Sequence, residues 1–529
     1  MKVLDAEAKQ AVQAVIDFNL AQLQEIPGFL SAEPGFPIVD GAVRREPAII
    51  VFVSQKKPPT HLLEEERAPR QLGPYRVSVM QADPLTQVEE LMSDSAIAGS
   101  LADSARGLTY KRLDGNPIDK PFKVSTAMLC HVGPDAGWPI LQPFIEATKK
   151  TLSVAMYDFN ADYIAKTFVE TMRNKKTVLT WDDGMTAPET KIRTKLRKML
   201  KKRLDGWIVR CGGGRRFASA YHEKVAVRDS SAFWLSSGNW SLRSQPEIDP
   251  IGDPASAKGM YSKGNREWHI IVEDKKLAEV FERYIRHDRD DSEKESKADA
   301  AIVLDVPEQP RLPDLFVPLE ALMADAAEGD APAPVAPAVL PKTPREITVL
   351  PLLTPDNYIG RIKKMLGDAK RSIHMQYAYI TYTDKPVDQE FTALLEMLAG
   401  LSSKPNLDMK IIVGSNGAAD KVRRLVQAGF NETVFRTQRN IHNKGIIVDG
   451  ETVLVSSANW SGDGVLRNRD AGLIIQDKDI AGYYQGVFLD DWENRASAFL
   501  EDDAPVMVAG DAEETPPGMV RMSWRDYYG

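Results

Sequence analysis

Two stretches of the 529-residue chain decide its fold: YHEKVAVRDSSAFWLSSGNWS at residues 221–241 and IHNKGIIVDGETVLVSSANWS at residues 441–461. Each carries H-x-K-x4-D followed by S-S-x-N, and in each the histidine precedes the asparagine by 17 positions. The two stretches lie 220 residues apart, which is far longer than the period of a solenoid repeat. The pattern therefore indicates two like domains.

The similarity continues on both sides of the motifs. Upstream, we align Tyr157 with Tyr377. Downstream, NREWHIIVED from Asn265 aligns with NRDAGLIIQD from Asn468, now at an offset of 203, so the first copy carries 17 extra residues after its motif. Short apolar segments alternate with helical segments in both copies, which favours an α/β fold with mixed sheets.

The rest of the chain divides around these copies. Residues 289–300 are a charge run, RDDSEKESKADA, and the following segment is rich in Pro and Ala, so both read as connecting chain. The boundaries that we predict are 1–120 for a small N-terminal α+β domain, 121–300 for the first copy, 301–345 for a Pro/Ala-rich linker, 346–500 for the second copy and 501–529 for a C-terminal tail, loose or draped over the body.

Strand alternation assigns faces within the motif. Its His and Lys are two positions apart and share one face of a strand, and its Ser and Asn share a face of the next strand. These residues are His222, Lys224, Ser237 and Asn239 in the first copy and His442, Lys444, Ser457 and Asn459 in the second. The aspartates are seven positions from the histidines, and Asp449-Gly450 is a hairpin signal. We interpret Asp229 and Asp449 as structural residues that support the motif.

The shared residue types fit phosphoryl chemistry. Lysine is a point-charge ligand of phosphate, asparagine and serine are neutral donors, and histidine can act as nucleophile or general acid. A two-step displacement uses two histidines, one on each side of phosphorus, and two facing copies would supply both. A partner on the other ring nitrogen must fix each tautomer. Glu267 and Asp470, in matching N-R-E and N-R-D contexts, are the candidates.

The duplicated HxKxxxxD with S-x-N, followed by N-x-E/D, resembles the phospholipase D superfamily over about residues 121–500. The resemblance implies two α/β/α sandwich domains in a pseudo-twofold pair with one active site between them, a covalent phosphohistidine, and neither metal nor other cofactor. It implies His222 as nucleophile and His442 as acid. It also implies that Lys224, Lys444, Asn239 and Asn459 bind phosphate and that Glu267 and Asp470 orient the histidines. Ser236 and Ser456 stand where the family usually has glycine, and Asp470 stands where Glu is common.

A basic amphipathic helix bears on the substrate. Residues 191–203 contain eight Lys and Arg and no acidic residue, with apolar residues at helical spacing. Its basic face is either an ordinary solvated surface or a contact with an anionic membrane surface or nucleic acid. Arg215 and Arg216, close by in sequence, would strengthen either contact.

Three functions stay open. The first is a phosphodiesterase that hydrolyses or transfers a phosphodiester of a phospholipid. The second is a metal-independent nuclease acting on DNA or RNA, because N-W-S after each motif resembles nucleolytic members of the superfamily. The third, disfavoured because both His-Lys pairs are intact, is an inactive binding or scaffold protein.

Composition excludes some classes of protein. With 67 Lys and Arg against 75 Asp and Glu, the net charge is −8, which disfavours a generally basic nucleic-acid-coating protein. Two cysteines support neither a disulfide framework nor a cysteine metal site. The polar N-terminus predicts no secretory signal, and no long apolar run predicts a membrane span, so we expect a cytoplasmic protein, peripheral at a membrane if the basic helix binds lipid.

Overall fold

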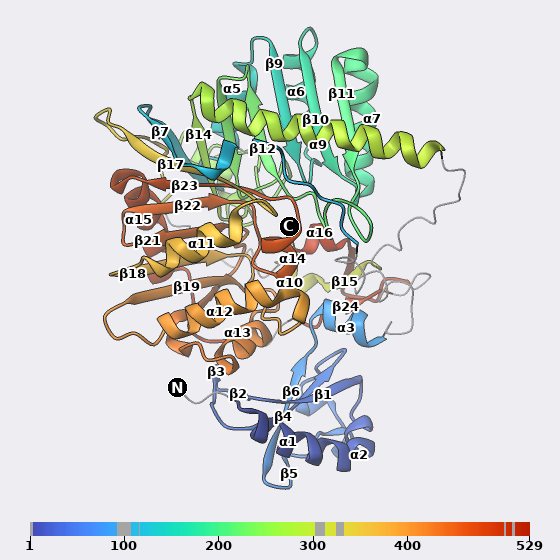
Figure 1. Cartoon of the computed structure of the whole chain (residues 1–529). Helices are drawn as coiled ribbons and strands as arrows, with labels where there is room; N and C mark the ends of the chain where they lie inside the picture. Colours follow the sequence, from blue (N-terminus) through green and yellow to red (C-terminus); the bar gives the residue numbers. More distant parts are fainter. Residues whose placement is uncertain are drawn as a thin grey trace.

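A computed structural model describes residues 4–91, 107–115, 117–301, 313–323, 333–501, 504–509 and 514–528. The N-terminal part is a small sheet in the order β1-β4-β6-β5, covered by α1 and α2 (Figure 1). Its elements are α1 (Ala6–Phe18), α2 (Leu20–Gln24), β1 (Phe29–Gly35), β4 (Ala48–Val53), β5 (Gln71–Leu72), β6 (Tyr75–Gln81) and α3 (Pro84–Leu91), with a β2 (Ile38–Val39) and β3 (Ala42–Val43) hairpin beside them. β4 is buried along its whole length, which explains its unbroken apolar run, AIIVFV.

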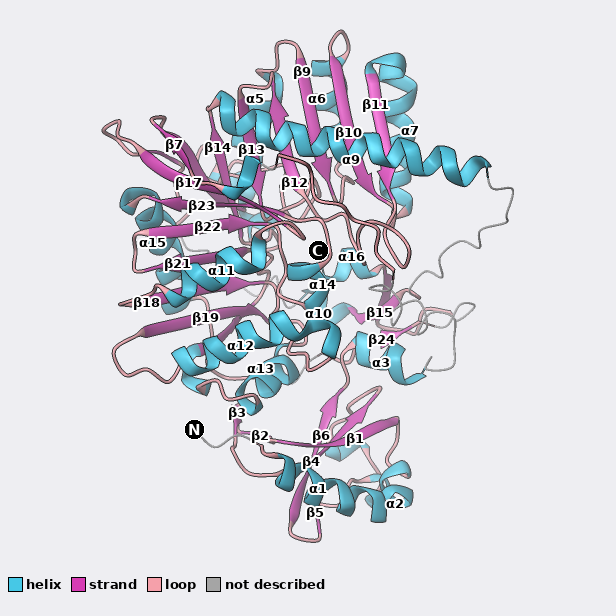
Figure 2. Ribbon diagram, viewed as in Figure 1, coloured by secondary structure: helices cyan, strands magenta, loops and turns pink. Residues whose placement is uncertain are grey.

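The first copy forms an eight-stranded mixed sheet (Figure 2). Its order is β11 (Leu204–Val209), β10 (Lys176–Asp182), β9 (Thr151–Met156), β12 (Lys224–Arg228), β13 (Ala232–Ser236), β14 (Glu267–Val272), β8 (Met128–Gly133) and β16 (Ala338–Leu340). Its helices are α5 (Trp138–Glu146), α6 (Asp162–Met172), α7 (Ala187–Leu200), α8 (Pro254–Tyr261) and α9 (Lys275–Ala301). β9, β10 and β11 are parallel, whereas the motif strands β12 and β13 are antiparallel.

The second copy repeats this arrangement. Its order is β20 (Phe435–Gln438), β19 (Asp408–Gly414), β18 (Ser372–Tyr377), β21 (Lys444–Val448), β22 (Thr452–Ser456), β23 (Ala471–Gln476), β17 (Ile347–Leu353) and β7 (Phe122–Val124). Its helices are α11 (Tyr358–Gly367), α12 (Gln389–Leu401), α13 (Ala418–Gln427), α14 (Gly462–Leu466) and α15 (Lys478–Asn494). Two mixed sheets with helices on their faces confirm the fold class predicted from the sequence.

The two copies exchange their edge strands. β7 lies at the start of the predicted first copy but pairs with β17 of the second sheet. β16 lies in the predicted linker but pairs with β8 of the first sheet. The expected boundaries at 121 and 345 therefore cut through shared sheets. The interface between copies is also apolar, since one continuous core includes Trp268 and Ile270 of the first copy with Val455 and Leu473 of the second.

The segments expected to be connections are more ordered than their composition indicates. The prediction that the charge run at 289–300 is connecting chain is wrong, because α9 continues through it to Ala301. Arg216 of the first copy donates to buried Asp288 and Ser292 on one side of α9. Polar contacts therefore hold this part of the helix, where the sequence has no apolar stripe. Within 301–345, the structure describes β15 (Leu315–Pro318), α10 (Leu319–Met323) and β16.

The C-terminal tail lies against the body. β24 (Met507–Val508) and β25 (Met519–Met522) flank β15 in a small antiparallel sheet, and α16 (Trp524–Tyr528) follows between the two copies (Figure 1). Gln87 of α3 donates to the Val506 carbonyl at 2.6 Å, which joins the N-terminal part to this sheet. Among the described residues, no helix combines the length and apolar character that crossing a membrane requires.

Candidate active site

The two motif histidines are each bound by an acid from the other copy. His222 Nδ1 lies 2.7 Å from Asp470 Oδ1, and His442 Nδ1 lies 2.7 Å from Glu267 Oε1. Local backbone pairing causes this crossing. The His222 N–H donates to the Arg469 carbonyl at 2.7 Å, and the His442 N–H donates to the Arg266 carbonyl at 3.2 Å. Asp470 and Glu267 directly follow these two arginines, so each acid is placed beside the histidine of the other copy. One complete site therefore needs both copies.

Buried arginines fix the two crossing segments. Arg266 Nε donates to Asp491 of α15 at 2.9 Å, and the same guanidinium contacts Asp135. Arg469 Nε donates to Asp288 of α9 at 2.8 Å. The fork of each guanidinium thus ties the acidic strand of one copy to a helix of the other. The arginines of N-R-E and N-R-D were not among the predicted site residues, although both motifs contain them.

The remaining motif side chains converge on the same place. Ser237 Oγ donates to Glu267 at 2.6 Å, and Ser457 Oγ donates to Asp470 at 2.8 Å, so the serines orient the acids. Lys224 Nζ donates to the backbone carbonyl of His222 at 2.8 Å, and Lys444 Nζ makes the equivalent bond to the His442 carbonyl. Lys224, Lys444 and Asn239 are fully buried, whereas Asn459 is partly exposed.

The motif aspartates lie away from the histidines. Asp229 accepts the backbone N–H groups of Lys149, Lys150 and Thr151 at 2.6–2.9 Å. Asp449 accepts the equivalent three N–H groups of residues 370–372. Both aspartates have a left-handed φ, 52° and 56°, at the hairpin between the motif strands. They close the hairpin and anchor the start of the neighbouring strand.

Burial controls the protonation of the His–acid pairs. It lowers the pKa of His442 to about 4, although Glu267 opposes this effect, and it lowers the pKa of His222 well below its usual value. Burial alone would raise the pKa of Glu267, but His442 and the hydrogen bonds to this carboxyl lower it to about 2. Burial raises the pKa of Asp470 to about 7, against the opposing charge of Lys224. Both imidazoles are therefore neutral at pH 7.

The two buried lysines have lowered pKa values. Burial lowers the pKa of Lys444 to about 7. Burial and the nearby charge of Lys444 lower the pKa of Lys224 well below its usual range. An anion bound between the lysines would reverse both effects, because an opposite charge favours the protonated amine. The site is thus built for a negatively charged group.

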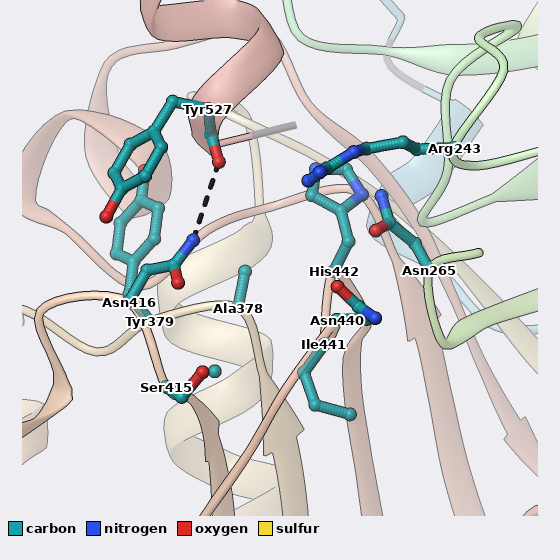
Figure 3. Close-up of a pocket in the computed structure, with 11 residues that line it drawn as sticks. Arg243, Asn265, Ala378, Tyr379, Ser415, Asn416, Asn440, Ile441, His442 and Tyr527 are labelled. Atoms are coloured by element: carbon teal, nitrogen blue, oxygen red, sulfur yellow. Dashed lines mark hydrogen bonds between the residues drawn. The ribbon is translucent and has the colours of Figure 1, made fainter. Parts of the chain in front are cut away.

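A cavity of about 40 Å³ opens beside His442 (Figure 3). Its lining includes Arg243, Asn265, Tyr379 and, from the C-terminal helix, Tyr527. By the volume that a water molecule needs, it holds a few waters. The motif did not predict Arg243 or Tyr527, since neither has a counterpart in the repeat.

The alignment of Tyr157 with Tyr377 is wrong by one residue. Lys224 pairs with Met156 and Lys444 with Tyr377, so Met156 is the structural equivalent of Tyr377. Tyr157 corresponds instead to Ala378. Its ring lies 4.6 Å from that of His222, edge to face, whereas Ala378 lines the cavity beside His442. The surroundings of the two histidines therefore differ.

The basic helix forms as predicted at α7, with Ile192, Leu196 and Leu200 buried. The exposed cations are Lys191, Arg197, Lys198, Lys201, Lys202 and Arg203. Arg216 does not strengthen this surface, because it is buried and bonded to Asp288 and Glu295. Arg215 pairs with Asp299 at 3.2 Å, so it too is neutralised by α9.

Parts of the chain are similar to known proteins. Residues 362–492 match the family model described as cardiolipin synthase, PLD-like domain. The phosphatidylserine synthase of Haemophilus influenzae Rd KW20 is similar over 70% of this chain and 89% of its own, at 12% identity and a TM-score of 0.42. The phospholipase D family member Nuc from Salmonella typhimurium is 21% identical over 28% of this chain and 98% of its own, with a TM-score of 0.24. No curated protein sequence matches the chain.

Proposed function

From its membership in the phospholipase D superfamily, carried by residues 362–492, we propose that the chain is a phosphodiesterase that works through a covalent phosphohistidine. One observation carries the proposal: the two histidines hold acids of opposite copies at 2.7 Å, with two buried lysines beside them. Each acid occupies Nδ1, so Nε2 is the reactive nitrogen of both rings.

The reaction has two balanced steps. The lone pair of His222 Nε2 forms a bond to phosphorus while the bond from phosphorus to the leaving oxygen breaks, and a proton on His442 Nε2 passes to that oxygen. Water or an alcohol then returns a proton to His442, and its oxygen displaces His222 from phosphorus. The charge of the bound phosphodiester raises the pKa of His442, which supplies the proton of the first step.

Lysine charge stabilises the transition state in this scheme. Lys224 and Lys444 face the equatorial oxygens of phosphorus, and the asparagine amides, Asn239 and Asn459, donate to the same oxygens. Positioning and electrostatic stabilisation of this kind are the main contributions of a protein to phosphoryl transfer. The scheme assigns no step to a metal, so we expect turnover to persist in a chelator.

A phospholipid is the substrate that we propose first. The matched family model is described as cardiolipin synthase, which names a phospholipid-forming enzyme. The exposed cations of α7 and of the turn that follows it provide a surface suited to anionic headgroups. The same cations fit nucleic-acid phosphates, so a nuclease is the second candidate.

Trapping the covalent intermediate tests the proposal. The full chain is mixed with phospholipid vesicles with and without anionic lipid, or with single- and double-stranded oligonucleotides, then quenched in alkali and digested for mass spectrometry. We expect a phosphoryl adduct on His222, lost in His222→Ala and kept in the matched variant of an exposed histidine, His61→Ala. An adduct with oligonucleotides alone would favour the nuclease. An adduct on His442 alone would reverse the assigned roles, and no adduct with any substrate would contradict the proposal.

A further inference from the structure

The C-terminal segment brings an arginine close to His222. Arg525 lies on α16, and its side chain is only 9% exposed. Its guanidinium donates to the Tyr157 carbonyl at 3.0 Å and to Glu189 at 2.9 Å, and it contacts Asp182. The Cζ atom of the guanidinium lies over the Tyr157 ring, 4.0 Å from its centroid. Every polar contact of Arg525 is thus to the first copy.

Two of these contacts lead directly to His222. The Tyr157 ring contacts both groups, with Arg525 over it and the centroid of the His222 ring 4.6 Å away. Asp182 accepts the backbone N–H of Tyr221, the residue before His222, at 2.7 Å. Arg525 therefore holds both the ring that contacts His222 and the carboxylate that fixes its backbone.

The second copy lacks all three supports. Strand pairing makes Ala378 the equivalent of Tyr157, and Gly414 the equivalent of Asp182. Ala378 and Gly414 both line the cavity beside His442. The volume that Tyr157, Asp182 and Arg525 fill beside His222 is therefore open beside His442. Tyr157 and Asp182 thus support His222, whereas the equivalent positions beside His442 border a cavity with room for a leaving group or a water.

We propose that Arg525 is a positioning residue of the active site, which holds His222 through Tyr157 and Asp182 and so makes it the nucleophile. The assignment rests on the phosphodiester chemistry proposed above. It also explains the acidic cluster of Asp182, Asp183 and Cys211, whose possible ligand atoms lie within 4.8 Å of one another. The Arg525 guanidinium forms ion pairs with both Asp182 and Glu189, so it neutralises negative charge at this cluster without a metal.

The experiment compares Arg525→Ala with Arg521→Ala, a matched arginine of the same tail that pairs with Asp314 at 2.8 Å on the small sheet. The probe is bis(p-nitrophenyl) phosphate. We expect Arg525→Ala to slow phosphohistidine formation by roughly 10- to 100-fold with KM changed less than about threefold, the scale of a small misplacement of a reacting group. Added guanidinium should restore part of the rate. Arg525→Lys, which keeps the charge without the fork, should lie in between and guards against misfolding.

A second readout does not depend on turnover. The groups facing His222 are Lys224, Lys444, His442 and Arg525, which lower its pKa together with burial, and Asp470, which binds its Nδ1. Titration of labelled histidines by NMR should therefore give a higher His222 pKa in Arg525→Ala than in Arg521→Ala. If both variants match the wild type in rate and titration, Arg525 is not a positioning residue. If the wild type forms no phosphohistidine but the His222 titration still shifts, the proposed chemistry fails and the positioning role stands.

Discussion

At the scale of single residues, the two lysines set the working pH range of the site. Lys444 has its pKa lowered to about 7 by burial, and Glu267 and Asp470 oppose the effect only in part. The amine therefore loses its charge as pH rises through 7, in the range where an ordinary lysine stays protonated. A neutral Lys444 would no longer attract a phosphodiester.

We predict that kcat/KM falls above about pH 7 and that Lys444→Arg moves this alkaline limb upward, because a guanidinium stays charged throughout. Initial rates on bis(p-nitrophenyl) phosphate from pH 5 to 9 measure it. Lys410→Arg, a lysine paired with Asp408 outside the site, should leave the profile of the wild type unchanged. The same alkaline limb in the wild type and Lys444→Arg would assign it to another group.

At the scale of elements, a large residue of one copy packs against a small residue of the other. A Cβ on Gly445 of β21 would lie 2.3 Å from the Trp268 indole of β14. At the equivalent positions the sizes are reversed, with Val225 in the first copy and Ala471 in the second, all within one core. Gly445 follows Lys444 directly, so this packing also helps to fix the backbone position of the lysine.

We predict that Gly445→Ala destabilises the protein by about 1–3 kcal/mol, the usual cost of overpacking a core. Urea unfolding measures the loss, and Trp268→Phe in the same chain should recover part of it by removing the clashing ring. The control is Gly486→Ala on α15, where a Cβ meets nothing within 4 Å and the helix should be stabilised slightly. Equal stability of Gly445→Ala and the wild type would contradict the packing argument.

The sequence predicted what depends on local spacing. Side-chain alternation predicted that His222 and Lys224 share a face and that Asp229 points away from both. In the structure Lys224 Nζ donates to the His222 carbonyl, and Asp229 accepts from backbone N–H groups of residues 149–151. The sequence could not predict that His222 binds Asp470 of the other copy, because this contact arises from backbone pairing between the copies. Arg525 has no counterpart in the repeat, and its position depends on how β25 pairs with β15. Tyr157 was misaligned because tyrosines fall at adjacent structural positions in the two copies.

At the scale of the whole molecule, the two copies are one folding unit. Each supplies an edge strand to the other's sheet, through β7 and β16. Each arginine of the crossing segments bonds a helix of the opposite copy, as Arg266 does with Asp491. An isolated copy would expose the shared core to water and would lose the hydrogen bonds that Arg266 and Arg469 make to helices of the other copy.

We predict that cutting the chain between the copies leaves an associated, active protein. A specific protease site inserted between residues 328 and 329 is cleaved after purification. Because the edge strands, the core and the arginine contacts all persist without a covalent link, the halves should elute together in gel filtration and form phosphohistidine at the rate of the uncut chain. Their thermal midpoint should now rise with protein concentration, since unfolding has become dissociation. Separation of the halves at micromolar concentration would mean that the linker, rather than the exchanged strands and shared core, holds the two motif histidines in one site.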